Sequence, residues 1–244
     1  MWKIVYKAAS PKTCYDWAGR IFPWVLILTL GTFGYGLLAG LGLAPPDYQQ
    51  GDAYRIIFIH VPSAAWSLGI YVMMSAAALI HLVWKIKIAD IVAKLSAPIG
   101  ASFTVLALIT GSIWGKPTWG TWWIWDARLT SELILLFIYG GIIALRAVMP
   151  QPQLVSQASG ILTLVGLVNI PIIHFSVDWW QTLHQGATVL KLSSPSIAGS
   201  MLHPLLAMLA AFFCYYLTLL LIGLRYELLK REQQSHWVKQ LLAD

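Results

Sequence analysis

The feature that most constrains this chain is a series of long stretches without a single charged residue. The uncharged runs cover residues 21–46, 56–84, 95–115, 133–145, 147–177 and 192–224. A membrane-spanning helix needs about 20 mostly apolar residues, whereas the strands of a membrane barrel are segments of about 10 residues that alternate in polarity. Because most of the runs are much longer and do not alternate, the sequence predicts membrane-spanning helices rather than a barrel.

Six spans account for the whole chain, which we predict to be an all-α, polytopic integral membrane protein. The short fourth run can extend into its neighbours, and the fifth and sixth runs begin in turns marked by proline and serine. Only 11% of the residues are charged and 58% are hydrophobic, whereas a soluble domain carries about 25% charged residues. Residues 1–244 are predicted to form a single membrane domain, with helices at roughly 21–43, 57–84, 95–115, 128–148, 154–177 and 202–224.

The distribution of lysine and arginine predicts the orientation of these helices. The termini and even-numbered loops hold twelve basic residues, and the odd-numbered loops hold four. Since the cytoplasmic loops of membrane proteins are enriched in basic residues, we expect both termini in the cytoplasm. The twelve are Lys3, Lys7, Lys12, Arg20, Lys85, Lys87, Lys94, Arg146, Arg225, Lys230, Arg231 and Lys239, and the four are Arg55, Lys116, Arg128 and Lys191.

Motifs for several other functions are missing from the sequence. Cys14 precedes the first span and Cys214 lies within the last one, so no disulfide is expected between them. The nearest match to a nucleotide-binding P-loop, residues 111–117, is one residue short and has proline where serine or threonine belongs. No catalytic motif is recognisable, so we expect a chain that binds and positions a ligand and is not itself an enzyme.

The loop between the third and fourth predicted spans, residues 114–130, is rich in tryptophan. Five tryptophans fall within twelve residues, followed by Asp126 and Arg128. The membrane interface would explain one or two indole rings, but five indicate a platform for a large planar ligand. If this segment is helical, Trp119, Trp122, Trp123 and Asp126 share one face, although Gly120 argues against a continuous helix. The five are Trp114, Trp119, Trp122, Trp123 and Trp125.

Two histidines lie where loops can bring them to this tryptophan-rich segment. His60 opens the second span and His184 lies between the fifth and sixth, whereas His174 and His203 are embedded in predicted helices. Neutral imidazole binds iron, zinc or copper, but no cysteine accompanies the histidines on this side of the membrane. A pair of imidazoles beside an aromatic platform instead fits haem with axial histidine ligation.

The two propionates of a haem require cations in an apolar setting. Arg55 lies close to His60 in the sequence and Arg128 ends the tryptophan-rich segment, and guanidinium groups bind carboxylates through paired hydrogen bonds. Each arginine also has an ordinary explanation. Arg55 can anchor to a lipid headgroup, and Arg128 can pair with Glu132 one helical turn later.

The stretch WGTWWIWDARLTSE, residues 119–132, resembles the tryptophan-rich WWD signature of haem-handling proteins in cytochrome c maturation. The six predicted spans, the place of the signature between the third and fourth, and the flanking histidines further resemble the CcmC family, haem exporter protein C of the bacterial system I pathway. The larger haem lyases that share the signature have many more spans and fit less well.

This resemblance implies a function, a set of partners and a set of ligands. It implies non-covalent binding of haem b at the outer face of the bacterial inner membrane and delivery to the membrane-anchored haem chaperone CcmE. It also implies work with the ABC transporter subunits CcmA and CcmB and the small membrane protein CcmD. The family's haem histidines match His60 and His184, and its signature residues match the five tryptophans and Asp126.

Two other functions are compatible with the residues alone. A membrane redox protein with a bis-histidine haem would bury both ligands within helices. A transporter with an aromatic gate would place polar or charged residues near the bilayer midplane, where Asn169 is the best candidate. The position of His60 and His184 near one surface favours presentation of haem, with Asp126 orienting Arg128 or a tryptophan N–H.

Overall fold

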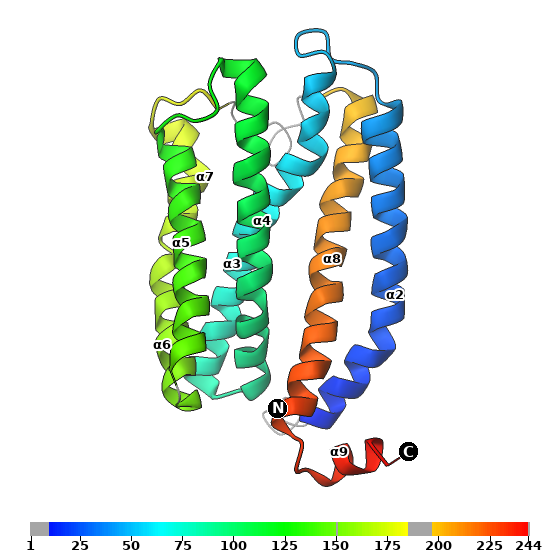
Figure 1. Ribbon diagram of the computed structural model, residues 1–244, viewed down its shortest axis with the longest axis vertical. Helices are drawn as coiled ribbons and strands as arrows, with labels where there is room; N and C mark the ends of the chain where they lie inside the picture. The colour runs from blue at the N-terminus through cyan, green and yellow to red at the C-terminus, as the bar shows by residue number, and fades with distance from the viewer. Residues whose placement is uncertain (1–9, 150, 185–196, 244) are drawn as a thin grey trace.

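The computed structural model, which describes residues 10–149, 151–184 and 197–243, is a bundle of long helices (Figure 1). Within these residues, six helical segments are long and apolar enough to cross a membrane, which confirms the predicted fold class. In chain order the elements are α2 (Pro11–Leu37), the π-helix η1 (Leu38–Leu43), the 3-10 helix η2 (Asp52–Ile56), α3 (Ile57–Trp84), α4 (Lys87–Trp119), α5 (Ala127–Val148), α6 (Pro152–Gly166), α7 (Asn169–Trp179), α8 (Gly199–Arg231) and α9 (His236–Leu241).

The helices form two groups that lie side by side (Figure 1). α2 packs mainly along α8, the helices from α3 to α7 pack with one another, and α8 joins the two groups through α3 and α4. α9 and the start of α2 lie at one end of the bundle, called here the terminal end, and the α4–α5 loop lies at the opposite end, called the tryptophan end (Figure 1). Lys3, Lys7 and Lys191, which entered the predicted charge asymmetry, lie outside the described residues.

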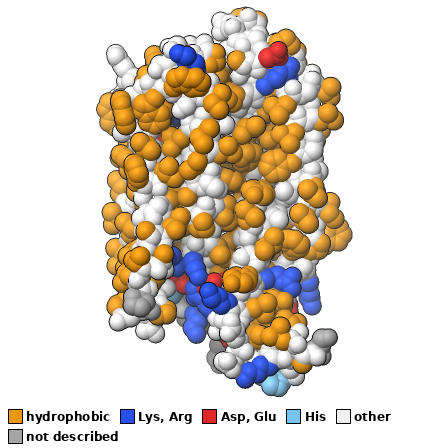
Figure 2. Space-filling model, viewed as in Figure 1, with side chains coloured by type: hydrophobic (Ala, Val, Ile, Leu, Met, Phe, Trp, Pro, Cys, Tyr) orange, Lys and Arg blue, Asp and Glu red, His pale blue; other side chains and the backbone are white. Residues whose placement is uncertain are grey.

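The outer surface of the bundle has the polarity expected of a membrane protein. Figure 2 shows charged side chains gathered at the two ends of one face, with hydrophobic side chains covering the middle. Phe137 exposes 69% of its surface, and Leu30 and Val165 each expose 65%. Exposing so much apolar surface to water is unfavourable, so this part of the bundle is suited to lipid chains.

Two buried tyrosines hold the interior of the α3–α7 group together. Tyr71 and Tyr139 expose no surface, and their rings meet edge to face with centroids 5.1 Å apart. The Tyr71 hydroxyl donates to the Thr163 carbonyl of α6 at 2.9 Å, and the Tyr139 hydroxyl donates to the Ser67 carbonyl of α3 at 2.8 Å. A buried hydroxyl needs such an acceptor, and these two bonds join α3, α5 and α6.

Three predicted helix ends are wrong, because charged residues continue the helices beyond the uncharged runs. α2 begins at Pro11 instead of residue 21, α4 begins at Lys87 instead of residue 95, and α8 ends at Arg231 instead of residue 224. The other first and last residues of the six spans lie within about four residues of the predicted positions. Charges are tolerated in such helix ends where they are paired or reach the membrane interface.

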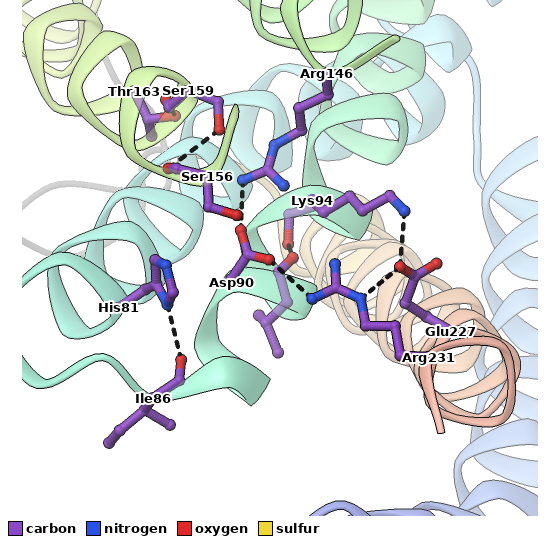
Figure 3. A network of polar contacts seen from close by, with 12 residues as sticks. His81, Ile86, Asp90, Lys94, Arg146, Ser156, Ser159, Thr163, Glu227 and Arg231 are labelled. Carbon is purple, nitrogen blue, oxygen red and sulfur yellow. Dashed lines mark hydrogen bonds and ion pairs between the residues drawn. The ribbon is translucent and has the colours of Figure 1, made fainter. Parts of the chain in front are cut away.

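Ion pairs at the terminal end show how the chain meets this condition (Figure 3). Asp90 of α4 accepts hydrogen bonds from Arg146 of α5 at 2.9 Å and from Arg231 of α8 at 3.1 Å. Glu227 of α8 accepts from Arg231 at 2.7 Å and from Lys94 of α4 at 2.8 Å. Only 3% of the Asp90 side chain is exposed, so its partners replace water. This network joins α4 to α5 and links the two groups of helices.

The predicted fifth span, 154–177, is two helices rather than one. A two-residue turn separates α6 from α7, and its residues donate to carbonyls only three positions back. Pro171 is the physical reason, because proline has no N–H and its ring clashes with the carbonyl four positions earlier, here that of Leu167. The Asn169 amide donates to the Ser131 carbonyl of α5 at 2.9 Å and fastens the break to the bundle.

Candidate functional site

The tryptophan-rich segment is a helix end, a short loop and a helix start, so the shared helical face suggested above is wrong. α4 ends at Trp119, and Gly120 closes it in the left-handed conformation with φ +78°, which glycine adopts without steric cost. Residues 121–126 are not helical. α5 then begins with Asp126 as its N-cap, where Oδ1 accepts from the backbone N–H of Leu129 at 2.8 Å.

Asp126 also holds the imidazole of His184. Its Oδ2 lies 3.2 Å from Nδ1 of His184 and accepts a hydrogen bond from the Thr182 hydroxyl. The side chains of Asp126 and His184 are only 7% and 17% exposed. An ionised carboxylate can only accept, so Nδ1 carries the proton and Nε2 keeps a lone pair for a ligand. The described hydrogen bonds of the Asp126 carboxylate are thus with Leu129, Thr182 and His184, and not with Arg128 or an indole N–H.

His184 is held as a neutral imidazole. Burial lowers the pKa of His184 below its ordinary value, against the opposing effect of the Asp126 carboxylate. The ring of Trp119 packs against it, with centroids 4.7 Å apart and the planes at 66°. A neutral imidazole with a free Nε2 is the form that binds a metal.

His60 lies in the first turn of α3, so it opens the span as predicted but belongs to a helix and not to a loop. Its Nδ1 is 3.1 Å from the carbonyl of Ala107 and 3.1 Å from the hydroxyl oxygen of Thr110, both on α4. The Thr110 hydroxyl donates its hydrogen bond to the carbonyl of Leu106 at 2.6 Å. Both neighbours of Nδ1 therefore accept, so Nδ1 carries the proton and Nε2 again keeps its lone pair. A Cβ on Gly111 would lie 3.0 Å from the ring, so glycine permits this close approach.

Helix α4 brings the two imidazoles to the same end of the bundle. It contacts His60 through Ala107, Thr110 and the Trp114 ring, and it contacts His184 through Trp119. His60 and His184 are close enough to interact electrostatically. Both histidines therefore lie beside residues of the tryptophan-rich segment, and their sharing of one ligand stays a prediction. His174 and His203 lie in α7 and α8, as expected.

The five tryptophans do not form one flat platform. Trp114 and Trp119 turn toward the imidazoles. The indole nitrogen of Trp123 is buried and has no acceptor among the described residues. Trp122 and Trp125 instead expose 57% and 76% of their surfaces. The segment thus offers an inward set and an outward set of rings.

The two candidate arginines have different surroundings. Arg55 donates to Asp52 at 2.9 Å and to the carbonyl of Gly40 at 3.0 Å, and the second bond ties it to the π-helix η1. Arg128 is partly buried and makes no ion pair or side-chain hydrogen bond within the described part of the chain. Arg128 and Glu132 interact electrostatically but form no direct ion pair among the described residues. The Glu132 carboxylate instead accepts a hydrogen bond from the hydroxyl of Ser67 at 2.7 Å.

A cavity of about 820 Å³ opens beside Asp126 and His184. The segment before α5 and the segment after α7 form its walls, which include Trp125, Trp180 and Leu183. Several residues at the tryptophan end were not among the predicted site residues. The adjacent Trp179 and Trp180 could have been found by the same concentration of tryptophan that marks the α4–α5 loop. Thr182, Thr110 and Gln50 are ordinary polar residues, and no sequence pattern distinguishes them.

Comparisons with known proteins agree on one family. Residues 4–239 match the family model described as "Heme exporter protein C". Proteins of that name from Haemophilus influenzae and Escherichia coli K12 are 50% and 49% identical over 241 and 242 residues, covering 99% of this chain and 98% of each relative. A "Putative cytochrome c biosynthesis ccmC-like mitochondrial protein" of Marchantia polymorpha is 46% identical over 171 residues, covering 70% of this chain and 72% of that protein.

Proposed function

Because the chain belongs to the heme exporter protein C family and so has a role in handling haem for cytochrome c maturation, we propose that it binds haem b non-covalently and delivers it to the haem chaperone CcmE. Binding takes place at the tryptophan end, which faces the periplasm from the bacterial inner membrane. CcmA, CcmB and CcmD are the proposed partners. The chain acts by holding and orienting haem, and it is not itself an enzyme.

The observation that carries this proposal is the matched state of the two histidines. His60 and His184 each place Nδ1 against acceptors and each keep Nε2 for a ligand. A metal-binding histidine usually donates its other N–H to a carbonyl or a carboxylate, which fixes the ring orientation. Here the Ala107 carbonyl serves His60 and the Asp126 carboxylate serves His184. Haem iron is the metal that suits two imidazoles among aromatic side chains.

Two hydrogen-bond donors of the tryptophan-rich segment suit the propionates of a haem. The guanidinium of Arg128 and the buried indole N–H of Trp123 have no acceptors among the described residues. The buried Trp123 N–H without an acceptor is costly, and a haem propionate would supply an acceptor to either group. Arg55 is proposed as a second propionate partner, although Asp52 and the Gly40 carbonyl already use part of its guanidinium.

The basic residues near the terminal end support the proposed orientation. Arg146, Arg225 and Arg231 lie at the inner ends of α5 and α8, and Lys85 joins α3 to α4. Basic residues favour the cytoplasmic side, and this supports our proposal that the terminal end is inside and the two imidazoles are outside. Haem bound there is accessible to a periplasmic chaperone.

The alternative functions fit the structure less well. The redox alternative requires both ligands within helices, but His184 lies in the segment after α7. The transporter alternative relied on Asn169, whose amide donates to the Ser131 carbonyl and fastens the break between α6 and α7. The position of His184 does not support a redox protein, and the hydrogen bond of Asn169 does not support a transporter.

The test is the absorption spectrum of the protein purified in detergent from cells that also make its partners. A Soret band that survives purification, together with transfer of the haem to added CcmE, is the expected result. Purified protein without a Soret band, or haem that CcmE cannot take up, would contradict the proposal. Free haem passed through the same column in the absence of protein gives the background.

A further inference from the structure

We infer that Gln50 is a positioning residue for haem binding, because it holds Trp114 and, through Trp114, restricts the imidazole of His60. This inference rests on the proposed function. Gln50 lies in the loop between η1 and η2 and belongs to neither the tryptophan-rich segment nor a predicted span. Two contacts connect it to the histidine, and hydrogen bonds within its own loop fix its backbone.

The first step is that the backbone at Gln50 is fixed. The Asp47 carboxylate accepts the backbone N–H of Gln50 at 2.8 Å, and Asp47 and Gly51 exchange backbone hydrogen bonds of 3.1 and 2.9 Å. The Tyr54 hydroxyl closes the loop by donating to the carbonyl of Pro45 at 2.7 Å. Such a loop has little freedom to move, so it can hold its side chains in set positions.

The second step is the bond from Gln50 to Trp114. The indole N–H of Trp114 donates to Oε1 of Gln50 at 2.8 Å. Trp114 is partly buried and packs against the cluster that contains Tyr54 and Phe58. An indole ring in such a setting needs one acceptor for its N–H, and the position of that acceptor decides how the ring is turned.

The third step is the contact from Trp114 to His60. Their ring centroids are 5.7 Å apart and the planes meet at 72°. The hydrogen bonds of Nδ1 to Ala107 and Thr110 fix one edge of the imidazole, and the Trp114 ring bounds it from another direction. Without the bond to Gln50, Trp114 is free to turn, and the imidazole loses part of the restriction that aims Nε2.

The experiment compares four single variants and one double variant of the full chain, each purified in detergent and titrated with haemin. Gln50→Met keeps the side-chain length and removes the acceptor, and Gln50→Glu keeps an acceptor oxygen. Gln49→Met is the matched control, because Gln49 is exposed and its side chain makes no described hydrogen bond. Trp114→Phe removes the donor, and the double variant combines it with Gln50→Met. Haem affinity and the low-spin electron paramagnetic resonance signal are both measured.

Gln50→Met should bind haem about fivefold more weakly, as expected for one lost hydrogen bond, and should broaden the low-spin signal. Gln50→Glu and Gln49→Met should behave like wild type, and adding Gln50→Met to Trp114→Phe should cause no further loss. Wild-type affinity and an unchanged signal in Gln50→Met would overturn the inference, as would additive losses in the double variant. A wild-type chain that binds no haem would instead overturn the proposed function.

Discussion

The carboxylate of Asp126 and the imidazole of His184, 58 residues apart in the sequence, meet at a distance of 3.2 Å between Oδ2 and Nδ1. Asp126 is at the same time the N-cap of α5, bound to the backbone N–H of Leu129 through Oδ1. One carboxylate therefore starts a helix with one oxygen and fixes the tautomer of a candidate haem ligand with the other.

Asp126→Asn should separate these two roles. An asparagine can still cap α5 through its carbonyl oxygen, but its amide donates toward Nδ1 and favours the tautomer that carries the proton on Nε2. We expect haem affinity to fall about tenfold or more, in the range found for partners of metal-binding histidines, while the protein elutes as a folded species. Haemin titration gives the result, and Asp178→Asn, an exposed aspartate near the same cavity, is the control. Equal affinity in both variants would remove the role assigned to Asp126.

The histidines should divide into two classes when each is replaced by alanine. His60→Ala and His184→Ala should change the haem spectrum, because each removes an available Nε2 at the tryptophan end. His81→Ala and His236→Ala should not, because His81 is bound to the carbonyl of Ile86 near the terminal end and His236 begins α9. Absorption spectra of the four purified variants decide the matter. Four identical spectra would contradict the proposed ligands.

Single tryptophan variants should retain haem. Trp119→Ala removes the ring that packs on His184, and Trp123→Ala removes one indole N–H, but a lost stacking contact is worth only roughly 1 kcal/mol beyond its buried area. Replacing the whole segment 119–126 should stop transfer to CcmE and weaken its co-purification, because exposed rings such as Trp125 are then lost as well. Haem content and CcmE pull-down are measured on the same samples. Loss of all haem from each single variant would show that the segment mainly binds haem.

The ion pairs at the terminal end should stabilise the bundle without affecting haem. Asp90→Asn leaves Arg146 and Arg231 without their buried carboxylate, and breaking a buried pair in this way costs about 3–5 kcal/mol. We expect an earlier thermal unfolding transition in detergent and an unchanged haem spectrum. Asp16→Asn, which alters an exposed carboxylate on α2, is the matched control. A normal transition for Asp90→Asn would mean that the network contributes little to stability.

The tryptophan end should face the periplasm. A periplasm-active reporter inserted near Thr121 should be active and the same reporter at the C-terminus inactive, because twelve of the sixteen basic residues fall in the termini and even-numbered loops. Protein abundance measured by immunoblot is the control for both fusions. The reverse pattern would place His60 and His184 in the cytoplasm and rule out delivery to a periplasmic chaperone.

Most of the fold was predictable, because lipid contact imposes long apolar runs on the sequence. The errors have one cause for α4 and α8: Lys94 and Arg225 were read as ends of spans, whereas Lys94 donates to Glu227 of α8 and Arg225 donates to the Tyr15 hydroxyl of α2. Pairing between distant residues is invisible in a single sequence. The break before α7 had a local signal in Pro171, which the hydropathy of the run concealed.

The candidate site was predictable in composition but not in geometry. His60, His184 and the tryptophans stood out by residue type and by their predicted side of the membrane. The acceptor for His60 is the Ala107 carbonyl, a backbone group that every residue possesses. Gln50 is likewise one polar residue among several in its loop, and only the folded chain places it beside Trp114.

The break between α6 and α7 gives the two histidines unequal supports. His60 is built into α3, a continuous helix of 28 residues, whereas His184 follows α7, a helix of 11 residues with a hydrogen-bond ladder of its own. A short helix with separate ends can open locally while its neighbours stay intact. The backbone that leads to His184 can therefore open with less loss of structure than the backbone that carries His60, an asymmetry that suits the proposed release of haem.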